Sequence, residues 1–66
     1  MNEPSDIQIT AMRAVLDDHE QRTGERPTTT GEAWMALAVH ARMHSPEWRD
    51  WVRLDQHRAP WLRRVL

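Results

Sequence analysis

Two histidines four residues apart, His40 and His44, have the spacing in this chain that most resembles a chemical site. Residues at i and i+4 share one face of a helix, and paired imidazoles at that spacing can bind zinc. The zinc-protease motif has a glutamate directly after the first histidine, where this chain has Ala41. The only plausible donors of a third ligand are Glu47, Asp50, His57 and His19. We therefore expect no metal and no cofactor, and interpret the pair as the end of a helix, where positive charge is favourable. A pH-responsive contact is the alternative.

Other catalytic patterns are weak, and we expect a protein that is not an enzyme and has no small-molecule substrate. The chain has no cysteine, and its serines, Ser5 and Ser45, are both better explained as helix caps than as nucleophiles. The adjacent carboxylates of Asp17 and Asp18 fit a solvated helix face. Two glycines are too few for a loop that cradles phosphate.

The first helix is expected over 6–23. Ser5 or Asp6 can cap its start by accepting from free backbone N–H groups, and Gly24 is placed to end it in a left-handed conformation. Its apolar positions recur at helical spacing and include Ile9, Met12 and Leu16.

A second helix is expected over 30–44, with Thr29 as N-cap and Glu32 three residues later completing a capping box. The apolar run Ala33–Val39 leaves this helix almost no polar face. Such a helix is buried on most sides. In so small a domain one side would remain open, and that side is a candidate dimer seam.

A third helix is expected over 46–58 and a short fourth over 60–66. Ser45 is predicted as N-cap and Pro46 as the first helical residue, since proline has the required φ and no N–H to leave unpaired. Strand patterns are absent. The sequence thus predicts an all-α fold, a compact bundle of three main helices plus a short C-terminal helical turn. We expect a single domain over 1–66, with 1–5 as a flexible N-terminus.

The four tryptophans all lie in the second half of the chain. We predict Trp34 and Trp51 as core. Trp48, in the first turn of a helix, and Trp61, after a proline and among arginines, are expected either at the rim of the core or as exposed contact residues. The second alternative makes them candidates for partner binding, because Trp and Arg are enriched in interface hot spots. The predicted partner-binding residues are Trp48, Arg49, Arg53, Arg58, Trp61, Arg63 and Arg64.

DNA binding is the main alternative. The stretch 23–28, which follows one helix and precedes two more, resembles the start of a winged helix-turn-helix domain such as that of the LexA repressor. The resemblance implies a recognition helix starting at Pro46, with Arg49, Arg53 and Gln56 facing the major groove. It covers less than half of the chain. The second helix is about a turn too long for it, no glycine lies in the turn, and nothing after Pro60 resembles a β-wing.

The composition also indicates the kind of genome that encodes the chain. All nine basic residues are arginine, a bias typical of GC-rich genomes, and we expect an accessory protein of an actinobacterial phage or mobile element. Up to Glu32 there are seven acids against three arginines, and beyond it six arginines against three acids. Such an asymmetry favours head-to-tail pairing of the acidic first half of one copy with the basic second half of another, or binding of an acidic partner by the basic half. We expect a homodimer or a module that docks on a protein, located in the cytoplasm (of the host, if phage-encoded). The longest apolar run, seven residues, is far below the ~20 needed to span a membrane. The polar, acidic first residues lack the basic and apolar regions of a signal peptide, and we expect none.

Overall fold

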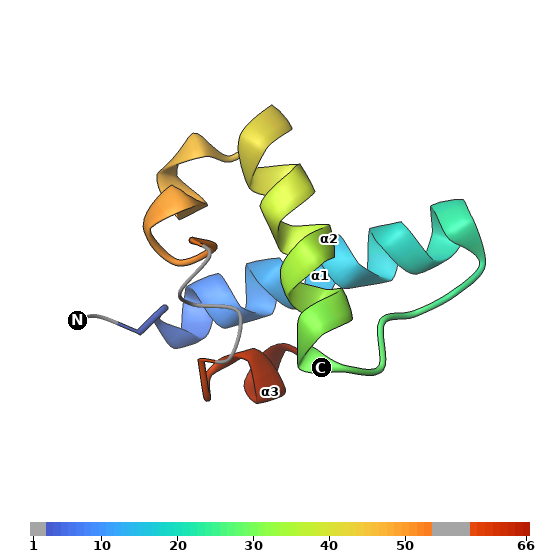
Figure 1. Cartoon of the computed structure of the whole chain (residues 1–66), viewed down its shortest axis with the longest axis horizontal. Coiled ribbons are helices and arrows are strands. Elements are labelled where there is room, and N and C mark those ends of the chain that lie inside the picture. The colour runs from blue at the N-terminus through green and yellow to red at the C-terminus, as the bar shows by residue number, and fades with distance from the viewer. Residues whose placement is uncertain (1–2, 54–58) are drawn as a thin grey trace.

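The computed structural model describes residues 3–53 and 59–66, and over these ranges the chain is all-α. Its elements are two long helices, a short 3₁₀ helix and a final helical turn: α1 (Asp6–Thr23), α2 (Thr30–Met43), η1 (Pro46–Asp50) and α3 (Leu62–Val65). The two long helices cross, η1 packs against α2, and α3 lies against both long helices (Figure 1). The described part contains no strand, and none of its helices is both long and apolar enough to cross a bilayer.

Helix α1 has the bounds predicted from the sequence, because both of its ends are encoded locally. The backbone N–H of Gln8 donates to Ser5 Oγ at 3.3 Å, and the Ser5 N–H donates to Gln8 Oε1 at 3.0 Å. This reciprocal capping box satisfies two N–H groups that the helix leaves unpaired. At the other end Gly24, at φ 82°, donates its N–H to the Glu20 carbonyl at 2.7 Å. The left-handed C-cap expected of this glycine is confirmed.

Helix α2 also begins as predicted, at the Thr29 cap, and ends one residue early, at Met43. The Glu32 N–H donates to Thr29 Oγ1 at 3.1 Å. The return bond differs from the capping box expected, since Glu32 Oε1 accepts from the N–H of Thr28 at 3.2 Å and not from that of Thr29. The glutamate therefore fixes the connection before the helix as well as its first turn.

The helix predicted over 46–58 is wrong in type and length within the described residues. The chain forms the five-residue 3₁₀ helix η1 and then a turn, while 54–58 lie outside the described residues. Trp48 donates its N–H to the Ser45 carbonyl at 2.9 Å, and Trp51 donates to that of Trp48 at 3.0 Å, both i to i+3 bonds. Pro46 does begin the element, but Ser45 makes no side-chain cap. Its Oγ lies 3.0 Å from His40 Nε2 instead.

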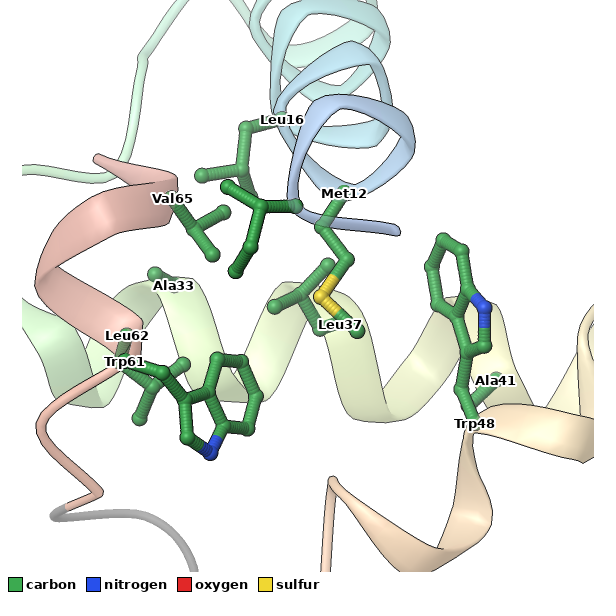
Figure 2. Packing of buried hydrophobic residues seen from close by; sticks show 10 residues of the cluster. Met12, Leu16, Ala33, Leu37, Ala41, Trp48, Trp61, Leu62 and Val65 are labelled. Carbon is green, nitrogen blue, oxygen red and sulfur yellow. The ribbon is translucent and has the colours of Figure 1, made fainter. Parts of the chain in front are cut away.

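The core lies where α1, α2 and α3 meet. Met12 and Leu16 point from α1 toward Leu37 of α2, with the indoles of Trp48 and Trp61 on either side (Figure 2). The fully buried large side chains are Met12, Leu16, Leu37, Leu62 and Val65. Small side chains at the inner face of α2, Ala33 and Ala41, let its neighbours approach closely.

Contacts from α1 hold the C-terminal turn in place. Arg13 Nε donates to the carbonyl of Arg64 at 2.8 Å, and the Arg64 guanidinium forms an ion pair with Asp6. Pro4 is buried and Ser5 belongs to the capping box. These two residues therefore have contacts with the rest of the chain, while 1–2 lie outside the described residues, and the flexibility expected over 1–5 stays a prediction.

Candidate functional site: an apolar groove along α2

A groove of about 430 Å³ lies between the second half of α1 and α2, at the edge of the core. We call it the α2 groove. Its apolar and aromatic lining comes from three segments, the second half of α1, the connection after it, and α2, and includes Val15, His19, Pro27, Met35, Val39 and Met43.

Three large apolar side chains of α2 remain exposed in this groove. Met35 is 63% exposed, Val39 56% and Met43 67%. They are spaced four residues apart, so they form one stripe along the helix. Singly exposed apolar residues are common on proteins, but a contiguous stripe beside a hollow marks an interaction surface. The open side of this helix expected from its composition is therefore present, and its residues are now identified.

The rim of the groove carries balanced charge. Its ionic side chains are two arginines and two glutamates: Arg22, Glu25, Arg26 and Glu32. Arg22 Nε is 2.9 Å from Asp18 Oδ2. Arg26 forms an ion pair with Asp17 and lies 3.5 Å from Glu20, and the hydrogen bond to Asp17 raises the pKa of Arg26. The guanidinium charges at the rim are thus largely offset by α1.

Three histidines, His19, His40 and His44, line the same groove. His40 is the most enclosed by aromatic neighbours: its ring centroid is 5.3 Å from that of His44 and 5.2 Å from that of Trp48. Burial lowers the pKa of His40, and the positive charges of His44 and Arg22 lower it further. The imidazole is therefore neutral near pH 7, with its Nε2 engaged by Ser45.

The predicted pair His40 and His44 is thus on one face, as its spacing requires. Within residues 3–53 and 59–66 no group of three His, Asp or Glu side chains could hold a metal ion. In this part of the chain the two imidazoles contribute to an apolar, aromatic wall.

The structure separates the four tryptophans differently from the sequence-based expectation. Trp48 and Trp61, for which core rim and exposed contact were both open, are 7% and 3% exposed and belong to the core, whereas Trp34 and Trp51, predicted as core, are only partly buried at its edge. The reason is the chain path. The i to i+3 geometry of η1 brings Trp48 beside Ala41, and the Trp61 indole lies beside α2 among the core side chains (Figure 2). A buried indole is unavailable to a partner unless the core opens.

The arginines predicted to bind a partner are dispersed. Arg49 and Arg53 line a second groove of about 440 Å³, together with Arg42 and Trp34. The indole Nε1 of Trp34 donates to the carbonyl of Arg53 at 3.1 Å. Arg63 is exposed on α3, and Arg64 is held by Asp6. Arg58 lies outside the described residues. Partner binding by these arginines stays a prediction.

No protein-family model matches the chain, and neither a curated protein nor a solved structure shows significant similarity to it.

Proposed function

We propose that this chain is a small, non-enzymatic protein-interaction module that binds a protein through the α2 groove. The observation that carries the proposal is the stripe of Met35, Val39 and Met43, three large apolar side chains that stay more than half exposed beside a hollow. Methionine suits such a role because its flexible thioether adapts to different apolar surfaces. The groove, rather than the tryptophans, now supports the interaction function.

Site-specific photo-crosslinking tests this proposal. A benzophenone amino acid at position 39 would lie in the groove, and the same residue in place of Gln21, exposed on the polar face of α1, serves as the matched control. We expect covalent adducts with protein from position 39 and few or none from position 21. Equal adduct yields at the two positions would overturn the proposal.

The proposed genetic context is an accessory protein of an actinobacterial phage or mobile element, acting in the cytoplasm of the host. Its support is composition alone: nine arginines and no lysine in a chain of 66 residues. Neighbouring genes that encode ordinary housekeeping enzymes, rather than phage or plasmid functions, would contradict it.

A second candidate function is DNA binding. It is favoured by Arg42, Arg49 and Arg53, which gather around the second groove and could meet phosphates. It is weakened by η1, because five residues of 3₁₀ helix are shorter than the recognition helix that the resemblance implies. Titration with duplex DNA at low salt, where phosphate contacts are strongest, tests this second function, and a lack of binding there would exclude it.

A further inference from the structure

We propose that the occupant of the α2 groove is a second copy of this chain, with the two α2 helices packed antiparallel about Val39. This inference rests on the proposed function, because it names the protein that the groove binds. It is carried by three features of the described residues: the symmetry of the exposed stripe, the distribution of charge along α2, and the small size of the domain.

The exposed stripe is symmetric about its central residue. Met35 and Met43 lie four residues before and after Val39, with the same side chain and nearly the same exposure, 63% and 67%. A two-fold axis through Val39 would therefore set Val39 against its counterpart and Met35 against the partner's Met43. Rows of residues four apart are the ridges that interdigitate in the commonest class of helix pair. A two-fold interface needs such a self-complementary patch.

Charge along α2 is also self-complementary in this orientation. The first turn carries Glu32, and the last turn carries Arg42 and is followed by His44, while His40 is neutral near pH 7. In the antiparallel pair Glu32 would lie within about one helical turn, ~5.4 Å, of the partner's His44. The side chains that line the groove include two arginines and two glutamates, so the formal charges of the lining itself balance.

Domain size favours association and limits its strength. A chain of this length buries only about 60% of the surface exposed by its unfolded form, and self-association is a common way to bury more. A typical specific interface covers about 800 Å² per partner, roughly a sixth of the 4711 Å² accessible surface of this chain. The three exposed side chains of the stripe supply only part of an interface of that size. We therefore expect a dimer that dissociates in the micromolar range.

Sedimentation equilibrium gives the first test. We expect the mass to rise from 7.8 kDa toward twice that value between low micromolar and near-millimolar concentration. Val39→Asp would place two carboxylates against each other in the interface and should weaken the dimer at least ~100-fold. Since Val39 is 56% exposed, its replacement should leave the thermal midpoint of the monomer unchanged. Ile7→Asp is the matched control, because Ile7 is 83% exposed outside the groove, and it should dimerise like the parent chain.

Disulfide trapping tests the orientation, and the chain contains no cysteine to interfere. Val39→Cys should form a disulfide-linked dimer under mild oxidation. Met35→Cys alone should not, because the two copies of that residue would be ~12 Å apart along the antiparallel axes, beyond the reach of a disulfide. Met35→Cys mixed with Met43→Cys should link efficiently. Self-linking of Met35→Cys would indicate parallel helices and overturn the proposed pairing.

The two proposals fail in different ways. A chain that stays monomeric at every concentration overturns the second-copy inference. If position 39 then still crosslinks specifically to a different protein, the interaction function stands. If position 39 yields no specific adduct of any kind, both proposals fail.

Discussion

Replacing Trp61 by alanine separates the two roles considered for this residue, core and contact surface. Trp61 is 3% exposed, so its removal deletes nearly all of a buried indole. A buried aromatic covers about 200 Å², which corresponds to ~5 kcal/mol of apolar transfer free energy at ~25 cal/mol per Å². Measured truncations of buried Phe or Trp to Ala cost about 3–5 kcal/mol. A domain of this size is expected to have only ~3–10 kcal/mol of unfolding free energy, so Trp61→Ala should bring the chain close to unfolding.

The matched control is Trp34→Ala, which removes the same side chain from the edge of the core. Trp34 is partly buried and donates to the Arg53 carbonyl, so we expect a loss of about 1–2 kcal/mol. Both variants are compared by urea unfolding followed by far-UV circular dichroism, at low micromolar concentration to suppress self-association. If Trp61→Ala is too unstable to show a baseline, Trp61→Phe and Trp34→Phe give a milder pair. A cost at Trp34 equal to or above that at Trp61 would refute the assignment of Trp61 to the core.

Three further predictions concern titration and the helix ends. The pKa of His40 is lowered in the folded chain, so the unfolded chain binds the proton more readily, and the unfolding free energy should fall as pH drops below about 6.5. Urea unfolding between pH 7.5 and 5 measures this fall, which should be smaller in His40→Asn than in the parent chain. An equal dependence of the unfolding free energy on pH in the two proteins would contradict the prediction. Gly24→Ala should lower the unfolding free energy by about 1 kcal/mol, because Gly24 is at φ 82°. Gly31→Ala, within α2 and with open space around it, should raise the unfolding free energy by ~0.5–1 kcal/mol. Thermal midpoints of the two variants that move in the same direction would refute this prediction. Ser5→Ala should cost ~1 kcal/mol through loss of the α1 cap, and an unchanged midpoint would show that the capping box contributes nothing.

The two long helices could be predicted from the sequence because their signals are local. The capping residues Ser5 and Thr29 and the terminating Gly24 lie within one turn of the groups they satisfy. Apolar spacing then identifies the inner face of α1. Such signals act over a few residues and do not depend on how the rest of the chain packs.

The segment after α2 could not be predicted in the same way. Pro46 marks where a helix can begin, but it specifies neither the hydrogen-bonding pattern nor the length of the helix that it starts. In the structure Ser45 bonds to His40 instead of capping, and Trp48 packs onto α2. These tertiary contacts favour a short 3₁₀ turn, and they place Trp48 in the core while Trp34 stays at its edge.

The candidate site was predictable in outline only. A helix apolar on every side, within a small domain, must leave one side open. Which side stays open depends on where α1 and α3 cross α2, and these crossings cover Ala33 and Leu37 while leaving Met35 and Val39 uncovered. The crossing is a property of the whole core, so a single helix sequence cannot specify it.

Methionine methyl NMR, followed as the protein concentration is raised from low micromolar to near millimolar, tests most directly the claim that the α2 groove binds a second copy of this chain. Met35 and Met43 lie in the groove, and Met12, fully buried in the core, is an internal control in the same spectrum. We predict that the methyl signals of Met35 and Met43 shift together along one binding isotherm while that of Met12 stays fixed. Signals of Met35 and Met43 that do not change at any concentration, or a shift of Met12 as large as theirs, would contradict the account.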